Sequence, residues 1–335
     1  INSWSYVRGG NIAANENQKT RALKVSDTER PAIRRLVKFT MPFQAGYDGV
    51  NILNVDTIAL NNNAVIGEMN DASRGSTSGP TVAAYRKALD IMSEKSDADI
   101  QLLAVPGIRH SSVTDEAITT VEERFDALYV MDIEERDNLN SVVTSSVQNV
   151  NISNTVTSFS DRALDTSFAA AFFPDINSNV TVKTLNNTTR TVEAQQATVR
   201  VPPSVGVLGA LSFNDSVAFP WFAPAGFARG ALNAESTAVS LNNTNLDDLN
   251  GKDINPIIAF PGSSGPVIFG QRTLQAAASA LDRINVRRLL IDVRRAVKQV
   301  AEQLIFEPNR ESTLQRFSAL VNPILQRVQE NQGLD

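Results

Sequence analysis

The chain has 335 residues, 42% of them hydrophobic and 20% charged, which is the composition of a globular protein with room for two or three domains. Its net charge of −5 argues against a nucleic-acid partner, because proteins that bind phosphate backbones usually carry a dominant basic surface. The absence of cysteine excludes disulfides, thiolate metal sites and catalytic thiols. No apolar run approaches the roughly 20 residues that a membrane-spanning helix needs, so we also expect no membrane role.

Residues 1–75 combine short β-prone runs with turns rich in Gly, Asn and Asp, and we expect a peripheral β-rich region there. The run from Val50 to Leu60 is an example, and a linker from Arg74 to Gly79 closes the region. The chain begins at Ile1 without the basic and apolar segments of a signal peptide. This start predicts a fragment of a longer polypeptide.

Residues 76–232 alternate between helical and strand patterns, which predicts a core domain of α/β class, α+β when the whole chain is considered. The expected elements are a helix over 80–95, a strand over 100–105, a helix over 114–125 capped by Thr114 or Asp115, a strand over 127–132 and a candidate strand over 168–173. This αβαβ order favours a mainly parallel sheet covered by helices.

A polar segment over 176–200 interrupts this core domain. It alternates apolar and polar residues and contains Asn186-Asn187, which predicts an exposed hairpin turning at these two asparagines. Because it lacks the apolar density of the core strands, we expect it to be peripheral and dispensable for stability.

Residues 233–335 predict a helical inner domain at the C-terminal end. The stretch 274–281 is alanine-rich, and an apolar stripe of period near 3.6 follows from Val286 to Leu304. Pro308 ends that helix, and Asn309 can cap a last helix over about 310–329. The residues expected on the buried face of the last helix are Leu314, Phe317, Leu320, Val321, Ile324, Leu325 and Val328.

Candidate catalytic residues are few. A Ser-His-Asp triad would have to use His110, the only histidine, in the loop after the strand over 100–105. An α/β hydrolase centred on His110 is therefore one alternative function, against a solvated loop histidine. The stretch from Gly75 to Gly79 resembles a nucleophile elbow but has threonine at its centre and no preceding strand, so it favours a linker.

Cofactor and metal motifs are also missing from the sequence. Neither a Walker pattern nor a Gly-x-Gly-x-x-Gly fingerprint occurs, and the acidic run from Asp247 to Gly251 does not fit the spacing of a calcium loop. The pairs Glu122-Glu123 and Glu134-Glu135 favour solvated faces. We expect no catalytic, cofactor-binding or metal site. A carbohydrate-binding surface protein, built on the Asn- and Thr-rich hairpins, is a further alternative.

A basic cluster stands out in this acidic chain. Its members are Arg283, Arg287, Arg288, Arg294, Arg295 and Lys298. One interpretation is a solvated helix face paired with local acids, and the other is a charge-complementary contact with a neighbouring subunit.

Several segments rich in proline, glycine and aromatic residues follow one another in the second half of the chain. They are Phe219 to Gly226, Ile254 to Gly262, Pro266 to Leu274, Ile284 to Leu289 and Phe306 to Asn309, with further segments upstream at Pro42 to Gly49, Leu102 to Gly107 and Val201 to Ser204. In this order they resemble the tail sheath proteins of contractile phages over about residues 39–330. Phe269 stands where that family usually has tryptophan.

The resemblance implies a structural subunit, with no enzymatic activity, that polymerises helically around a tail tube and contracts to drive the tube through the host envelope. It implies as partners other sheath subunits, the tube protein, the baseplate and the tail terminator, and as location the virion, after assembly in the host cytoplasm. The sheath of a phage-derived injection device such as an R-type pyocin is the alternative within this class.

The resemblance also implies which surfaces act. In this family the last helix of the inner domain faces the tube, and the residues of the helix over 310–329 that point away from its buried face are Gln315, Arg316, Gln326, Arg327 and Glu330. The basic cluster is the expected contact with neighbouring subunits. The family's terminal strands, which link subunits by β-augmentation, are expected to be absent here, so we expect this chain to be monomeric.

Overall fold

A computed structural model describes residues 4–6, 21–23, 60–96, 98–144, 148–185, 192–263 and 265–333. The chain divides into two compact units, residues 1–48 and 49–335. In the first unit, β1 (Trp4–Tyr6) pairs antiparallel with β2 (Arg21–Leu23). The run expected over 50–60 lies almost entirely outside the described residues.

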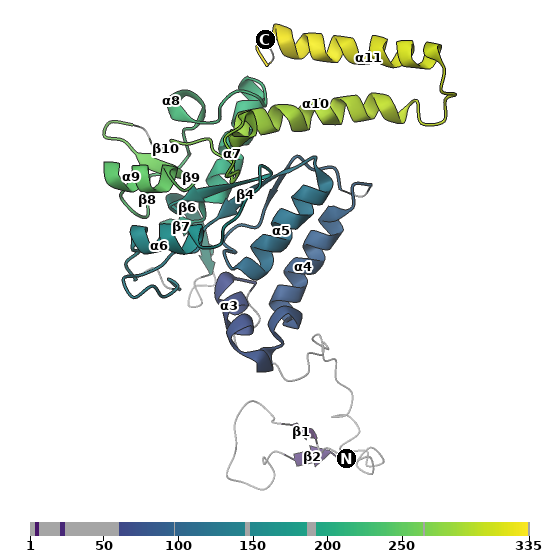
Figure 1. The fold of residues 1–335 in the computed structure, drawn as a ribbon. Helices are drawn as coiled ribbons and strands as arrows, with labels where there is room; N and C mark the ends of the chain where they lie inside the picture. Colours follow the sequence, from purple (N-terminus) through teal and green to yellow (C-terminus); the bar gives the residue numbers. More distant parts are fainter. Residues whose placement is uncertain are drawn as a thin grey trace. The chain divides into compact units, whose positions relative to one another are not determined.

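A five-stranded sheet forms the centre of the second unit (Figure 1), and its order is β10-β9-β5-β4-β3. The strands are β3 (Leu102–Ala104), β4 (Leu128–Asp132), β5 (Ala169–Phe173), β9 (Ile254–Ala259) and β10 (Pro266–Ile268). Neighbours from β3 to β9 are parallel, and only β10 is antiparallel. This confirms the predicted α/β class and the mainly parallel sheet.

Helices cover both faces of this sheet. Along β4, Tyr129 and Met131 point into a core shared with α4 (Pro80–Ser93) and α5 (Ser111–Arg124). Leu128 and Val130 point to the opposite face, onto α7 (Pro203–Val217) and the start of α10 (Ile284–Glu302). Because successive side chains of a strand alternate between faces, a strand buried on both sides carries a continuous apolar run, and β4 does so.

The remaining helices lie around these layers. They are α3 (Asn62–Asn70), α6 (Ile152–Ser160), α8 (Gly226–Arg229), α9 (Asn243–Asn250) and α11 (Glu311–Glu330), with 3-10 turns η4 (Ala72–Arg74), η5 (Ser76–Ser78) and η6 (Ala280–Asp282). The buried Glu68 of α3 accepts hydrogen bonds from the Thr81 and Val82 amides, which caps the start of α4 from another helix. A Cβ at Gly79 would meet this carboxylate, so a larger residue there would displace the Glu68 side chain from the start of α4.

Four local expectations are wrong. Residues 62–70 form a helix instead of β structure, because Asn61 accepts a hydrogen bond from Ala64 as an N-cap. The helix over 111–124 is capped by His110, not by Thr114 or Asp115. The alanine-rich stretch that begins at Leu274 is not helical. Leu274 forms a β-bridge with Thr166, and the irregular residues that follow lead to the 3-10 turn η6. The last helix begins after Arg310, and Asn309 does not cap it.

The hairpin expected over 176–200 is present. β6 (Ile176–Leu185) pairs antiparallel with β7 (Val192–Val201) over their full length, whereas β8 (Ser236–Thr237) pairs with only the first two residues of β6. The expected turn at Asn186-Asn187 lies outside the described residues.

The boundaries expected at 75/76 and 232/233 stay predictions. β9 and β10 lie beyond residue 232 and still belong to the sheet of β3, β4 and β5. Within the described ranges, no helix is both long and apolar enough to cross a membrane.

Candidate functional site

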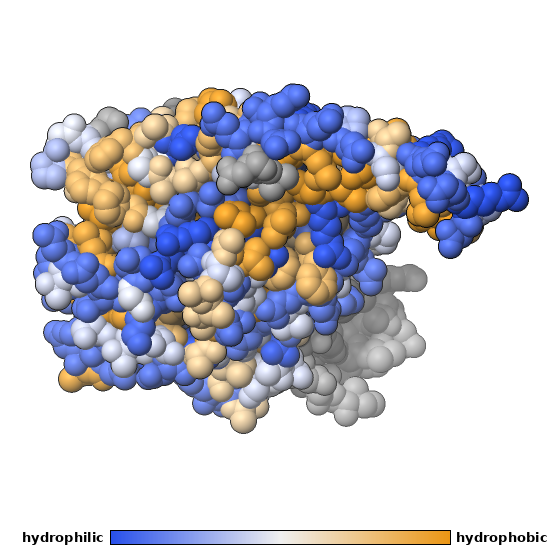
Figure 2. Space-filling view, turned by 45° about the horizontal axis from the view of Figure 1, so that its top comes forward, coloured by the Kyte–Doolittle hydropathy of each residue, from blue (hydrophilic) through white to orange (hydrophobic). Residues whose placement is uncertain are grey.

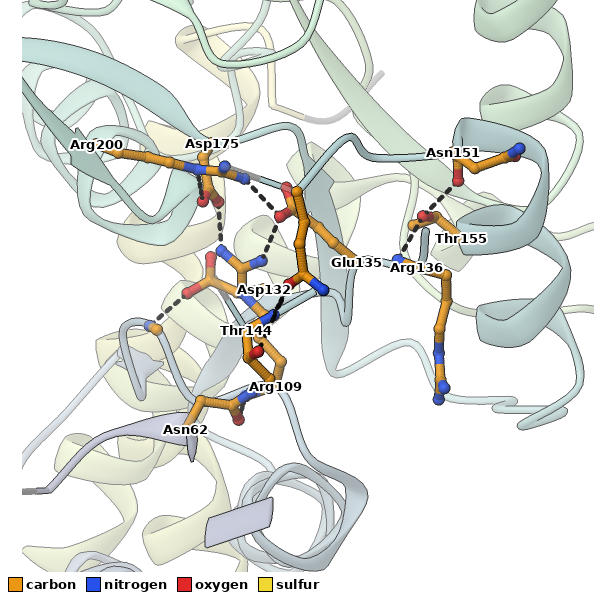
Figure 3. Close-up of polar contacts among 12 residues, drawn as sticks. Asn62, Arg109, Asp132, Glu135, Arg136, Thr144, Asn151, Thr155, Asp175 and Arg200 are labelled. Carbon is orange, nitrogen blue, oxygen red and sulfur yellow. Dashed lines mark hydrogen bonds and ion pairs between the residues drawn. The ribbon is translucent and has the colours of Figure 1, made fainter. Parts of the chain in front are cut away.

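Polar side chains converge where the parallel strands end, as Figure 3 shows. Asp132 is the last residue of β4, and its carboxylate accepts hydrogen bonds from the Ser204 amide at 2.8 Å, the Ser204 hydroxyl at 2.7 Å and the Gly107 amide at 2.9 Å. Ser204 lies in the first turn of α7, so Asp132 caps that helix. Gly107, in the turn after β3, has a φ of 79°, which favours glycine.

Beside Asp132, two arginines and two carboxylates form a closed ring of ion pairs, which we call the ion-pair ring (Figure 3). Arg109 contacts Glu135 at 3.2 Å and Asp175 at 2.5 Å. Arg200, on β7, contacts the same Glu135 at 2.5 Å and the same Asp175 at 2.7 Å. The ring joins the segments that follow β3, β4 and β5 to the hairpin.

Burial governs the protonation of this site. It raises the pKa of Glu135 despite the nearby Arg109 guanidinium, and it raises the pKa of Asp132 despite the hydrogen bonds from Gly107 and Ser204. Burial alone would lower the pKa of Arg109, but the charges of Asp175 and Glu135 outweigh it and raise that pKa. With Asp132, the site contains three carboxyl groups and two guanidinium groups.

The expectation that Glu134-Glu135 is a solvated pair is wrong for its second member. The Glu135 side chain is 3% exposed because it follows the buried strand β4 into the ring, and its Oε1 has no hydrogen-bond partner among the described residues. It lines a small pocket of about 170 Å³ together with Asn62 and Thr144. Glu134 instead pairs with Arg136 at 2.6 Å.

His110 acts as a helix cap. Its Nδ1 accepts a hydrogen bond from the Ser112 amide at 3.1 Å, and burial lowers the pKa of the imidazole. The elbow-like stretch around Thr77 forms 3-10 turns, and the acidic run expected to fail as a calcium loop lies in and after α9. Among the described residues, no group of three His, Asp or Glu side chains is placed to hold a metal ion.

The basic cluster spreads around α10 and makes contacts within the chain. Arg288 is 4% exposed and pairs with Asp215 at 2.5 Å, and Arg287 is buried, donates to the Ser167 hydroxyl and lies 4.0 Å from the centre of the Phe168 ring. The other members reach the surface. Arg294 lies over Phe125, Arg295 pairs with Asp99, Arg283 with Asp282 and Lys298 with Glu302.

The expected tube-facing residues lie together on the exposed face of α11. All five, from Gln315 to Glu330, are exposed, and Arg316 has Glu307 at 3.7 Å. Among the residues expected on the buried face, only Val321 and Val328 are buried, because α11 packs on α10 and on Trp221. Leu314 is 55% exposed and Leu320 40%.

The C-terminal end of α11 is anchored to the body. The Trp221 indole donates to the Asn331 carbonyl at 2.9 Å, and its ring stacks on Phe219. The connection between α10 and α11 is at the opposite end, where Phe306 is fully exposed. Figure 2, in which the top of the molecule in Figure 1 is turned toward the viewer, shows apolar side chains beside polar ones on that surface.

Sequence reasoning did not find the ion-pair ring. A signal was present, because an acidic residue of the ring follows closely after each of two buried strands, Glu135 after β4 and Asp175 after β5. Charged residues are almost never fully buried unless they are paired, so acids at these positions predict partners at the edge of the sheet.

The known proteins that are similar to this chain in sequence include phage tail sheath proteins. No protein-family model matches it. The tail sheath protein of Vibrio phage KVP40 is 36% identical over 135 residues, which are 40% of this chain and 20% of that protein. The tail sheath protein of Enterobacteria phage T4 is 26% identical over 242 residues, 71% of this chain and 36% of that protein.

The chain is similar in sequence to the tail sheath proteins of phages. The resemblance stated from the sequence is thereby confirmed, and the chain spans about a fifth to a third of the length of these two relatives. A solved structure of an extracellular contractile injection system, the PVC sheath complex in its contracted state, has a TM-score of 0.53 at 23% identity and covers 71% of this chain and 57% of its own. That similarity shows that the chain shares the fold of this solved sheath structure.

Proposed function

We propose that the chain is part of a structural subunit of a contractile phage tail sheath, without enzymatic activity. The subunit polymerises helically around the tail tube and contracts to drive the tube through the host envelope. The identity of 36% to a phage tail sheath protein carries this proposal, and the shared fold supports it. Contraction then uses differences in contacts between two lattices and needs no nucleotide site in the sheath.

The exposed face of α11 is the proposed contact with the tube. Gln315, Arg316, Gln326, Arg327 and Glu330 are exposed on this face. Contact with a tube that must later be released has to be weak at each copy. Exposed polar and charged pairs are worth about 0 to 1 kcal/mol each, and many copies add up along a tail.

The surface members of the basic cluster are the proposed contact with neighbouring subunits. Arg283, Arg294, Arg295 and Lys298 reach the surface, while the buried Arg287 and Arg288 hold α10 on the body. We propose the virion as the location, after assembly in the bacterial cytoplasm, with the baseplate and tail terminator as further partners.

A sheath of a phage-derived injection device is the second candidate. The similarity to the PVC sheath complex favours it, but that similarity shows the fold alone. The curated relatives, with higher identity in the best-matched segment, are phage proteins. Sheath-containing particles that carry a capsid would support the phage tail. Particles that contract but carry no capsid would support the injection device.

Charge reversal tests the tube contact. In the full-length protein, co-expressed with the tube protein, R316E/R327E should reduce the yield of tube-filled sheaths while the subunit remains folded. The matched control is K87E/K95E, which reverses two exposed lysines of α4 and the segment after it. Normal yield from R316E/R327E would place the tube contact elsewhere, with the basic cluster as the next candidate.

A further inference from the structure

In the described residues, the hairpin of β6 and β7 pairs with a third strand only at its root. On one side, β8 pairs with Ile176 and Asn177 of β6. On the other side, β7 is an edge strand, because the order of this sheet is β7-β6-β8. Pairing with β8 fixes β6 to the body, whereas β7 has no strand on its outer side and joins the body where Val201 leads into α7.

The ion-pair ring supplies a further attachment through side chains. Arg200 lies near the end of β7, and its guanidinium reaches Glu135, after β4, and Asp175, before β6. Arg109 contacts the same two carboxylates from the loop after β3, so the ring cannot shift as a whole without moving two segments of the core sheet. A guanidinium that contacts two carboxylates at once is held in direction as well as in distance.

The length of the hairpin amplifies any change at this root. Strands of ten residues extend about 33 Å, so a rotation of about 10° at the root would move the tip by about 6 Å. The ring lies at the root, where it controls that rotation. Other charges near it are those of Asp132 on β4 and of Glu134 and Arg136, which pair with each other.

We propose that the ion-pair ring is a latch that fixes the direction in which the β6–β7 hairpin projects from the core. With the ring closed, the hairpin is a rigid arm. With the ring open, only the short pairing with β8 and the chain connections to β5 and α7 hold the root, and the hairpin turns about them. This device is separate from the proposed surfaces on α10 and α11, and it needs no assembly to operate.

The test opens the ring at constant charge. R200M/E135Q removes one basic and one acidic group of the ring, so the formal charge of the site is unchanged. The control variant is R136M, which breaks the neighbouring pair with Glu134, a partly exposed pair that does not involve the hairpin. The chain has no cysteine, so T119C on α5 and V180C on β6, both exposed positions, accept a pair of spin labels selectively.

Double electron–electron resonance on the labelled full chain reads the direction of the hairpin. We expect one narrow distance distribution for the parent and R136M, and a distribution at least twice as wide for R200M/E135Q. Amide exchange should become at least tenfold faster at the hairpin root and stay unchanged in β4 and β5. An unchanged distance distribution in R200M/E135Q would overturn the latch, because the β8 pairing and the chain connections would then hold the hairpin without the ring. Loss of the folded core in this variant would also overturn it, because the ring would then be a support of the core.

Discussion

Asp132→Ala is expected to destabilise the second unit strongly. The substitution removes the carboxylate that holds the first turn of α7 to the end of β4, at 2.8 Å from the Ser204 amide and 2.9 Å from the Gly107 amide. The Ser204 amide loses its acceptor in a buried site and the Gly107 amide in a partly buried one, and a buried donor without a partner costs about 1 to 3 kcal/mol. The relief of a buried charge offsets part of this cost, so we expect a net loss of about 3 kcal/mol.

Urea unfolding followed by circular dichroism measures this loss. With a dependence on urea of about 3 kcal/mol/M, the midpoint should fall by about 1 M. The matched control is Ser204→Ala, which removes only the hydroxyl that donates to Asp132 at 2.7 Å and should cost about 1 kcal/mol. If Asp132→Ala cost no more than Ser204→Ala, the assignment of Asp132 as the cap that joins α7 to the sheet would be refuted.

Three further predictions concern the same unit. Burial raises the pKa of Asp132, so the folded chain binds this proton more tightly than the unfolded chain. The stability of the parent relative to Asp132→Asn should therefore rise as the pH falls toward the ordinary aspartate pKa of 3.8, and a constant or falling difference in urea midpoint would contradict it. Trp221→Phe removes the hydrogen bond to the Asn331 carbonyl and should lower the free energy of unfolding by about 1 kcal/mol. Amide exchange should become faster only in the last turn of α11, and unchanged exchange there would show that the indole does not anchor the helix. Replacing residues 180–197 by a short Gly/Ser linker keeps the hairpin root and should change the free energy of unfolding by less than about 0.5 kcal/mol, and a much larger loss in a melting experiment would place this segment in the core.

The sequence predicted those elements whose local pattern agrees with their surroundings. Pro80 begins α4 as expected, and the apolar runs of β4 and β5 indicated strands buried on both faces. β9 was not predicted, because Pro256 lies inside it, and a proline has no backbone N–H to donate within a sheet. Its place beside β5 depends on tertiary pairing, which no local pattern contains.

The candidate surfaces were predicted less completely. A helical period indicates which residues share a face, but it does not indicate how much of that face finds a partner. Val321 and Val328 of α11 are covered, whereas Leu314 on the same stripe is exposed. For the basic cluster, sequence spacing did not separate the buried Arg288, paired with Asp215, from the exposed Lys298. The difference depends on which segments of the body lie beside α10.

Electron microscopy of the full-length protein, expressed with its tube protein, tests the central claim most directly. We expect striated helical tubes that enclose a tube and that shorten and widen when contraction is triggered. A protein that is folded by circular dichroism and forms no helical polymer, with or without the tube protein, would contradict the proposed sheath function.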